Sequence, residues 1–387
     1  MLKRSLSAPG PREATSRDDG RDVKKRVQNG RERDLRNADL EIRRLEPGDA
    51  PALVRCVRRC YGGTYLHRDF YDPEAIRSLL QRGLLHSGIA LDETGEVVAH
   101  LGMLLERVGD RTADMVLGIV DPQYRGQQLI LRTGAVVAPE FERLGLIGVY
   151  QYATTAHEVS QKLTLATRSV ETGMLLGFLP EATTSMQTSS APPSWRLPAI
   201  MLYLPLATAP ARTAHVPQRY REVVSDIHAR VGLERRLVDG CADLPRRPAR
   251  LRSILDIPRA RVRIAVAAVG AGLVPEVARR LRDPATRSMQ IAQLDLPLSD
   301  PGTPAAVEAL RELGFFFGGV LPEFCEGDVL RLQSVPSQQV DSTAIALVSQ
   351  VGKRLLDFVL ADREQLGLRD CELSDPAGPS CHHQDAR

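Results

Sequence analysis

The chain has 387 residues, of which 43% are hydrophobic, and a formal net charge of +3. This length is ample for a buried core and suits about two domains. No apolar run approaches the ~20 residues that a bilayer span requires, and the N-terminus has no apolar signal core, so we expect a cytoplasmic protein without a membrane partner. The small net charge gives no general argument for nucleic acid, and we expect no such partner. Arginine dominates the 51 basic residues, which we interpret as the mark of a GC-rich bacterial genome.

The six cysteines are scattered and include no Cys-x-x-Cys pair. Cys56 and Cys60 lie one helical turn apart, which indicates a helix face before it indicates a redox or metal pair. The cluster at 381–383 has one cysteine and two histidines in a polar tail, which does not make a metal site. We therefore expect neither a disulfide framework nor a metal.

The first 39 residues have almost no apolar content, so we expect a disordered tail over 1–39. Its basic cluster at 24–26 fits a solvated tail, and attraction to nucleic acid or a membrane surface stays open. Residues 40–45 alternate and predict a first strand. Asp49 and Asp72 are expected to start two helices, and the strands at 88–91 and 97–105 flank a polar turn and predict a hairpin.

The chain is organised around the segment 114–145. Its apolar run at 115–120 predicts a buried strand, which Asp121 and Pro122 end. After a polar turn, apolar residues recur at helical spacing from 130 to 144, and Gly145 stands where a left-handed cap belongs. The segment therefore predicts a strand, a short turn and a helix.

A turn of this kind presents free backbone N–H groups at the positive end of a helix, which is a ready anion site. Arg125 adds a fixed charge, and Gly126 allows a ligand to approach the backbone closely. The turn is therefore a candidate site for an anionic ligand.

The ten residues from 120 to 129, Val-Asp-Pro-Gln-Tyr-Arg-Gly-Gln-Gln-Leu, resemble the acetyl-CoA-binding motif of the GCN5-related N-acetyltransferases. The order of the preceding elements, one strand, two helices and antiparallel strands, is also the order of that fold. In the family, a β-bulged strand and the pattern Arg/Gln-x-x-Gly-x-Gly/Ala hold the pyrophosphate and pantetheine of CoA. Arg125 and Gly126 match this pattern, whereas Gln128 and Ile130 stand where it has small residues.

The resemblance implies acetyl-CoA, or another acyl-CoA, as co-substrate. The residues that would hold it are Ile119, Val120, Arg125, Gly126, Gln127, Gln128, Leu129 and Ile130. The loop at 61–65 would correspond to the loop that shapes the acceptor pocket in the family, and an ordinary connection between helices is an equal alternative.

A strand at 146–153 and a following helix would complete the site. In the family, the strands on either side of the CoA turn splay apart around the acyl thioester, and a tyrosine on the next helix protonates the departing thiolate. His157 stands near the start of that helix, and Thr164 stands near the tyrosine position. The resemblance therefore implies that the usual acid is missing.

The candidates for acid–base catalysis are Tyr150, Tyr152 and His157, with Glu158 beside them. A histidine suits the chemistry best because its ordinary pKa is ~6.5. His157 would serve equally well as a residue that satisfies backbone groups at the start of a helix, and one of the tyrosines would serve as a core residue. We interpret His100, inside the hairpin, as a packed histidine.

The second half of the chain repeats the pattern of the first. A strand at 200–205 would close an acetyltransferase domain over 40–207. The expected elements of residues 208–340 are a helix at 217–237, a strand at 262–269, a helix at 273–281, a strand at 289–296 and a helix at 304–313. The glycine- and phenylalanine-rich segment 314–322 follows, and a strand at 328–333 could close the sheet. The phrase at 313–322 echoes that at 176–180, which indicates a divergent copy of the same fold. Its turn at 269–275 has glycines but no arginine, so we expect no CoA there.

A last helix, capped by Ser342, is expected over 341–365, and a disordered tail over 366–387. The sequence thus predicts an α/β (α+β) fold: a mixed, mostly antiparallel sheet flanked by helices, in two tandem copies that resemble one intact and one degenerate acetyltransferase domain. The copies would be arranged like a homodimer joined in one chain, and self-association of the whole chain stays open.

The function that the resemblance implies is direct transfer of an acetyl or other short acyl group from CoA to an amine acceptor, either a small molecule or a peptide. The alternative is a non-catalytic acyl-CoA-binding or scaffold protein on the same fold.

Overall fold

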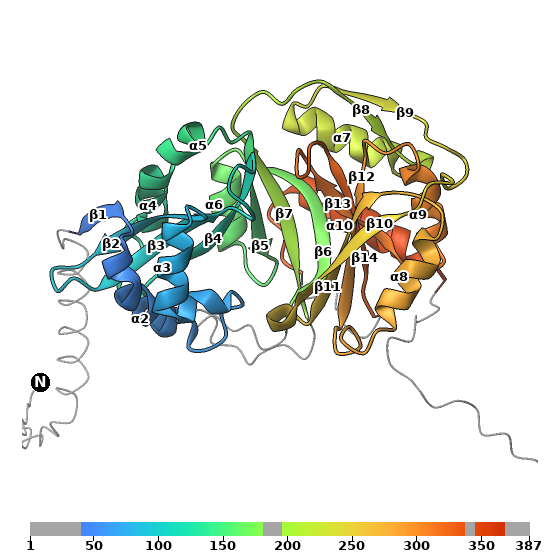
Figure 1. Ribbon diagram of the computed structural model, residues 1–387. Helices are drawn as coiled ribbons and strands as arrows, with labels where there is room; N and C mark the ends of the chain where they lie inside the picture. Colours follow the sequence, from blue (N-terminus) through green and yellow to red (C-terminus); the bar gives the residue numbers. More distant parts are fainter. Residues whose placement is uncertain (1–39, 181–195, 337–344, 368–387) are drawn as a thin grey trace, which may run out of the picture.

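The computed structural model describes residues 40–180, 196–336 and 345–367 (Figure 1). The expected tail at 1–39, nearly all of the tail at 366–387, and Ser342 lie outside these residues. Below, the first half means residues 40–207 and the second half means residues 208–367.

A sheet of twelve strands runs through both halves in the order β1-β2-β3-β4-β5-β7-β6-β13-β14-β12-β11-β10. Its strands in chain order are β1 (Glu41–Arg44), β2 (Leu85–Leu91), β3 (Val97–Leu104), β4 (Thr112–Val120), β5 (Gly148–Thr154), β6 (Val170–Leu179), β7 (Leu197–Pro205), β10 (Arg250–Asp256), β11 (Arg261–Ala268), β12 (Ile291–Pro297), β13 (Phe316–Leu321) and β14 (Val329–Ser334). Two short strands, β8 (Arg212–His215) and β9 (Arg235–Val238), form a separate parallel pair.

Within the large sheet, the parallel pairs are β4–β5 and β11–β12, and the other paired strands are antiparallel. The α-helices in chain order are α2 (Ala50–Tyr61), α3 (Pro73–Gln81), α4 (Leu129–Val137), α5 (Pro139–Arg143), α6 (Val159–Ala166), α7 (Arg221–Val231), α8 (Leu273–Leu281), α9 (Thr303–Arg311) and α10 (Gln350–Glu364). The expected α/β fold with a mixed, mostly antiparallel sheet flanked by helices is confirmed.

Helices cover both faces of the sheet in the first half (Figure 1). Successive residues of a strand point to opposite faces, and β2 shows this directly: Ile89 packs into the core under α2, whereas Ala90 packs with Leu129 of α4. The helices α2 and α3 thus lie on one face, and α4 lies on the other. We call the face of α2 and α3 the front face.

The strand order of the first half recurs in the second. From β3 to β6 the sheet runs β3-β4-β5-β7-β6, with successive pairs antiparallel, parallel, antiparallel and antiparallel. The strands β10-β11-β12-β14-β13 follow the same order with the same directions.

The halves join where β6 pairs with β13, at Gly173 and Gly319. The backbones approach so closely there that a Cβ on either glycine would collide with the other strand. The buried side chain of Gln333 closes the junction: its Nε2 donates to the carbonyls of Met174 (2.8 Å) and Phe317 (2.9 Å), and its Oε1 accepts from the Leu176 amide (2.8 Å). A single hydrophobic core extends from β5, β6 and β7 through the whole second half.

Several expected boundaries are wrong for identifiable reasons. The helix expected at 130–144 is two helices, because Pro139 starts a new one at its first position. The helix expected at 217–237 ends at Val231, because Gly232 adopts a left-handed cap with φ +80° and β9 follows. The last helix begins at Gln350 and is capped by Ser349, whose side chain accepts from the Gly352 amide.

The strands β8, β9 and β10 were not expected. Their sequences are rich in arginine, and on β10 no residue is fully buried, so an apolar pattern could not indicate them.

Candidate active site

The eight residues expected to hold CoA form one continuous structure from the end of β4 to the first turn of α4. Ile119 is buried in β4, and Val120 ends that strand. Arg125 is exposed, and Gly126 has a φ of +83° with no atom within 4 Å of the place of a Cβ. The turn is therefore open to a ligand on the side where glycine stands.

Gln128 caps α4 in an unusual way. It adopts the left-handed conformation with φ +54°, and its carbonyl accepts the amides of both Leu131 (3.0 Å) and Arg132 (3.1 Å). These are the first bonds of the helix, so the amides of Leu129 and Ile130 belong to the first turn, which an α-helix leaves without internal partners. An anion placed before this turn would meet those amides, the helix dipole and the charge of Arg125.

The strand before this turn carries a β-bulge. The pairing of β3 with β4 shifts between His100–Ile119 and Gly102–Val116, and Leu117 has a φ of +50°. The Leu117 amide donates to the Tyr65 hydroxyl (2.9 Å), and the Leu117 carbonyl lies 2.8 Å from Nδ1 of the fully buried His100. Tyr65 comes from the loop expected near the acceptor, and the interpretation of His100 as a packed histidine agrees with this geometry.

The strands β4 and β5 separate beyond the start of their pairing. They pair only at three positions, from Thr112–Gly148 to Asp114–Tyr150, whereas β4 continues to Val120 and β5 to Thr154. The two strands therefore diverge on either side of a gap that begins beside Asp114 and contains the bulge.

The structure gives the two candidate tyrosines different environments. Tyr150 is 1% exposed, donates its hydroxyl hydrogen bond to the Pro322 carbonyl of the second half, and packs its ring on Tyr203 at 5.2 Å. Burial raises its pKa well above the usual value. The Tyr150 hydroxyl thus fastens the β13–β14 turn to β5.

Tyr152 is only partly buried. Its ring stacks on Phe178 at 5.0 Å with 13° between the planes, and its hydroxyl interacts with the guanidinium of Arg331. Burial raises the pKa of Tyr152, and the negative charge of Asp114 raises it further. The hydroxyl is therefore protonated at neutral pH.

His157 lies three residues beyond the end of β5 and two before α6, whose N-cap is Glu158. Its side chain is partly buried, and burial lowers its pKa. The N-cap residue Glu158 makes no side-chain cap bond, and the His157 side chain interacts with its own backbone. The hydroxyl of Thr164 is 3.0 Å from each of the carbonyls of Ser160 and Gln161, so it is occupied within its own helix.

Sequence reasoning missed a polar surface on the front face of the second half. On β11, Val262 and Ile264 are buried in the core, whereas Arg261 and Arg263 point the other way and stay partly exposed. The neighbouring strands present Asp295 and Arg331 in register, and Arg331 binds the Asp295 carboxylate through Nε (2.7 Å) and Nη2 (2.8 Å). The signal in the sequence is a charged residue at alternate positions of otherwise apolar strands.

This polar surface lies near Asp114 and Tyr152 of the first half. The positive charges of Arg331, Arg261 and Arg263 each act to lower the pKa of Tyr152. Those of Arg263 and Arg331 also act to lower the pKa of Asp114. The guanidinium of Arg261 lies 5.0 Å from the centre of the Phe178 ring on which Tyr152 stacks.

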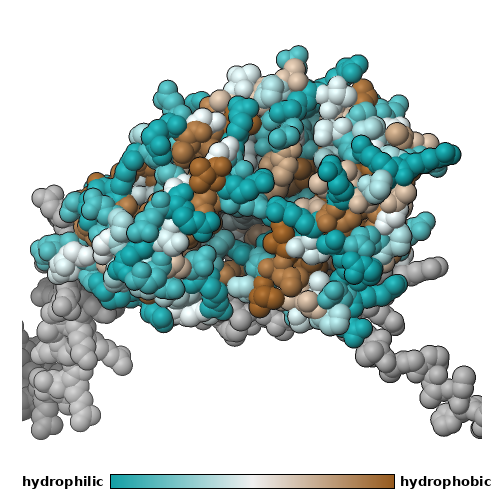
Figure 2. Space-filling model, in the orientation of Figure 1, coloured by the Kyte–Doolittle hydropathy of each residue, from teal (hydrophilic) through white to brown (hydrophobic). Residues whose placement is uncertain are grey.

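Two contacts hold the rim of this region together. Arg259, at the turn between β10 and β11, donates to Nε2 of His67 in the loop after α2 (2.9 Å). Glu106, at the end of the β3–β4 hairpin, accepts from Arg252 (3.1 Å) and Arg263 (3.3 Å). Figure 2 shows that the front face is hollowed between the two halves and that hydrophilic side chains surround much of the hollow. We use the name inter-half cleft for the region between the halves around Asp114, Tyr152, Arg263 and the buried Arg331, whose charges act on one another.

The turn of the second half that corresponds to the β4–α4 turn is filled by the protein itself. The backbone of Arg247 lies against Gly270, so that a Cβ there would collide with the Arg247 carbonyl. The carboxylate of Asp300 accepts the Val269 amide (2.9 Å) and the guanidinium of Arg247. The partners that an external anion would need are therefore already taken.

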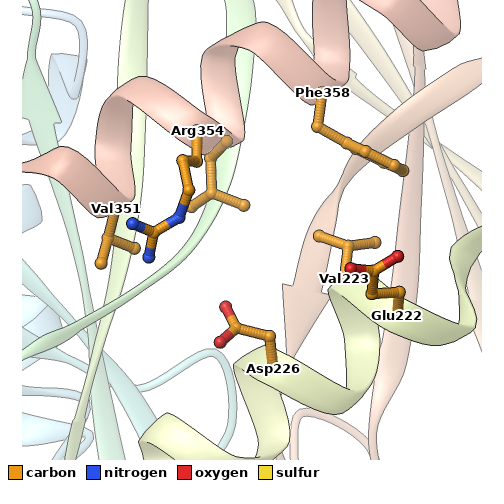
Figure 3. A pocket seen from close by; sticks show the side chains of 7 residues that line it. Glu222, Val223, Asp226, Val351, Arg354 and Phe358 are labelled. Atoms are coloured by element: carbon orange, nitrogen blue, oxygen red, sulfur yellow. The ribbon is translucent and has the colours of Figure 1, made fainter.

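A separate cavity of about 360 Å³ lies between α7 and α10 (Figure 3). Figure 3 shows Asp226 and Arg354 pointing into it from opposite sides, with Val351 and Phe358 beside them. It shares no residue with the β4–α4 turn or the inter-half cleft, so it is not part of the candidate site.

Comparison with known proteins gives only distant similarities. No family model and no curated protein matches the chain. Among solved structures, it is similar to mutant forms of the spermidine/spermine N-acetyltransferase SpeG from Vibrio cholerae, at 15% identity and a TM-score of 0.33 over 43% of this chain and 93% of that one. It is also similar to a ribosomal-protein-S18-alanine N-acetyltransferase from Escherichia coli, at 19% identity and a TM-score of 0.34 over 44% of this chain and 96% of that one.

A further similar structure is a ribosomal-protein-S5-alanine acetyltransferase from Vibrio fischeri, at 15% identity and a TM-score of 0.34 over 43% of this chain and 92% of that one. Within the described residues, no helix has the length and apolar character needed to cross a membrane. The strand order of the first half, the bulge in β4 and the divergence of β4 from β5 give residues 40–207 the GCN5-related N-acetyltransferase-like fold that the sequence predicts.

Proposed function

We propose that the protein is an acyl-CoA-dependent N-acyltransferase, which moves an acetyl or other short acyl group from CoA to an amine by direct transfer. CoA would bind at the β4–α4 turn, and the amine would enter through the inter-half cleft. The observation that carries this proposal is the divergence of β4 from β5 after three paired positions. The resulting gap has an open, positively charged turn at one end and two ionisable groups, Asp114 and Tyr152, at the other.

Arg125 and the first amides of α4 would hold the pyrophosphate, because charge-assisted hydrogen bonds to phosphate are the strong ones. Beyond Asp114, β4 no longer pairs with β5. Amides on that edge of β4, other than the Leu117 amide that Tyr65 binds, would stabilise the oxyanion that forms at the thioester carbon. CoA supplies the activated acyl group as a thioester.

Tyr152 is the residue that we assign as proton donor to the departing thiolate. Its hydroxyl is protonated at neutral pH and interacts with the guanidinium of Arg331 in the cleft, whereas that of Tyr150 donates to the Pro322 carbonyl. His157 is the second candidate, but burial lowers its pKa, which leaves less of its acidic form near neutrality.

Three variants test this assignment with acetyl-CoA and a panel of primary amines. We expect Tyr152→Phe to lower turnover about 10²–10⁴-fold, the usual contribution of one acid–base group, and to leave CoA affinity unchanged. Tyr150→Phe should keep turnover and lose about 1 kcal/mol of stability with its hydrogen bond. If His157→Asn shows the large loss and Tyr152→Phe does not, the proton donor is His157.

A non-catalytic acyl-CoA-binding protein is the second candidate, favoured by the Thr164 hydroxyl that is occupied within its helix. It predicts that acetyl-CoA binds in calorimetry and that no amine of the panel is acylated. We also propose that the second half is a divergent copy of the first that forms one wall of the acceptor site and binds no CoA. The repeated strand order and the filled turn support this proposal.

A further inference from the structure

We infer that Asp114 takes the proton from the acceptor amine, in a cleft whose opposite wall is the second half of the chain. This inference rests on the proposed function and deepens it, because it identifies the acceptor as a primary amine that enters as its ammonium ion.

Asp114 stands at the branch point of the sheet. It forms the last pair between β4 and β5, opposite Tyr150, and it precedes the bulge at Leu117 by three residues. Paired residues of neighbouring strands point to the same face, so Asp114 shares the face of Tyr150 and, through alternation along β5, of Tyr152. A carboxylate at this point lies beside the place where the gap opens.

The carboxylate of Asp114 has no structural partner in the part of the chain that the structure describes: it takes part in no hydrogen bond and no ion pair there, although it is only partly exposed. The other acidic groups of the cleft are engaged. Asp295 binds Arg331, Asp256 binds Arg259 and Arg261, and Glu106 binds Arg252 and Arg263. Asp114 is thus the acidic group that this cleft leaves available.

The charged groups around Asp114 come from both halves. Arg263, Arg331 and Arg259 of the second half favour its ionised form, and Glu106 of the first half opposes it. Burial outweighs them and raises the pKa of Asp114 to about 6. The tyrosines 150 and 152 face it from β5. The group is therefore ionised at neutral pH and a stronger base than an exposed aspartate, which suits proton abstraction.

The chemistry then follows in balanced steps. The ammonium form of the acceptor pairs with the Asp114 carboxylate and transfers one proton to it, which frees the nitrogen lone pair. The amine nitrogen attacks the thioester carbonyl carbon, the C–N bond forms and the C–S bond breaks. Tyr152 protonates the thiolate and regains a proton from solvent, the amide nitrogen loses its second proton to solvent, and Asp114 returns its proton to solvent.

The first test is Asp114→Asn, compared with Asp110→Asn, a matched change in the same hairpin, where Asp110 pairs with Arg107 at the surface. With acetyl-CoA and spermidine, n-propylamine or a peptide beginning with alanine, we expect Asp114→Asn to lower turnover about 10²–10⁴-fold and to remove the acid limb of the pH–rate profile near pH 6. CoA affinity should not change. Turnover within threefold of the native protein would overturn the inference while leaving the proposed function intact.

The second test needs no acceptor. In the full chain labelled with ¹³C at aspartate carboxyl groups, one signal should titrate near pH 6 and vanish in Asp114→Asn; titration of this signal at or below pH 4 would overturn the inference.

Thermal stability gives a third test. Because the folded-state pKa of Asp114 is raised, the folded protein holds its proton more tightly than the unfolded chain, so stability falls as the pH rises from about 4 to 6. The melting temperature of Asp114→Asn should therefore exceed that of the native protein at pH 8 and approach it at pH 4. A native protein that melts above Asp114→Asn at pH 8 would contradict this environment. If the native protein binds no CoA, the proposed function itself is refuted.

Discussion

The two strand–turn–helix units of this chain, β4–α4 and β11–α8, occupy the same place in two stretches of sheet with the same strand order and differ in whether they are open. In the first, β4 and β5 pair at three positions and then diverge; in the second, β11 and β12 pair at five. The strand β11 ends three residues beyond its last pair, whereas β4 ends six residues beyond. The longer divergence, along which we propose that the pantetheine chain of CoA lies, therefore belongs to the first of these two units.

The residues that follow the second strand of each unit account for much of this difference. His157 and Asp300 each lie three residues beyond the end of β5 and β12 respectively. Asp300 reaches back to the Val269 amide and closes the turn, together with Arg247. His157 has no such bond, and Nδ1 of its ring has no partner within the described residues. The same strand–turn–helix unit thus forms an open turn or a closed structural joint, according to which groups fill the turn.

The largest effect that this comparison predicts is on stability. Asp300→Ala would leave the buried amides of Val269 and Gly302 and the guanidinium of Arg247 without their partner. At 1–3 kcal/mol for each unsatisfied group, we expect the free energy of unfolding to fall by about 3 kcal/mol or more, measured by urea denaturation. CoA affinity should stay the same.

The control is Asp239→Ala, whose side chain is 88% exposed in its pair with Arg221 and should contribute little. A second CoA site created by Asp300→Ala would show that this carboxylate alone keeps the second turn from binding.

The next effect concerns binding at the open turn. Arg125→Ala should weaken CoA binding about tenfold to a hundredfold, because it removes a charge-assisted contact with phosphate worth ~1.5–3 kcal/mol. Calorimetric titration should also give one CoA per chain. Arg132→Ala, a change of the same charge on the exposed side of α4, is the control. Equal losses in the two variants would reduce the effect of Arg125 to general electrostatic attraction.

The smallest expected effect comes from the glycines of the two turns, which can be compared directly. Gly126 and Gly272 have nearly equal positive φ angles, +83° and +79°, and neither has an atom within 4 Å of the place of a Cβ. Alanine at either position should therefore cost about 1 kcal/mol of stability from backbone strain. Only Gly126→Ala should also reduce CoA affinity. If both variants bind CoA as the native protein does, the approach of a ligand to Gly126 is not close.

Much of the fold could be predicted from the sequence because its elements follow local rules. The run at 115–120 was expected as a strand and lies within β4, and Gly145 has the positive φ of +65° expected of a cap. The turn residues from Arg125 to Ile130 could be named because they are contiguous. Asp114 could not, because it precedes the apolar run and its role depends on where β4 leaves β5.

The polar surface of the second half could not be predicted from the sequence for a related reason. Asp295 and Arg331 lie in strands whose other residues are apolar, so they look like interruptions of a core until the pairing of β12 with β14 brings them together. The burial of Tyr150 depends in the same way on a distant contact, the Pro322 carbonyl. Local patterns indicate which segments are strands, whereas the partners of a side chain are set by the pairing of segments far apart in the chain.

The junction at Gly173 and Gly319 has a consequence for substrate exchange. Many enzymes admit substrate by rotating one domain away from another about a hinge. Here such a rotation would separate the backbones of β6 and β13 and break the two hydrogen bonds by which the buried Gln333 reaches Met174 and Leu176 of β6. We therefore expect the two sides of the inter-half cleft to keep a constant spacing, with or without a bound acceptor. In the proposed function, selection by acceptor size would then depend on a rigid frame, and product would leave through movements of the loops at its rim, where the Arg259–His67 contact joins the two halves.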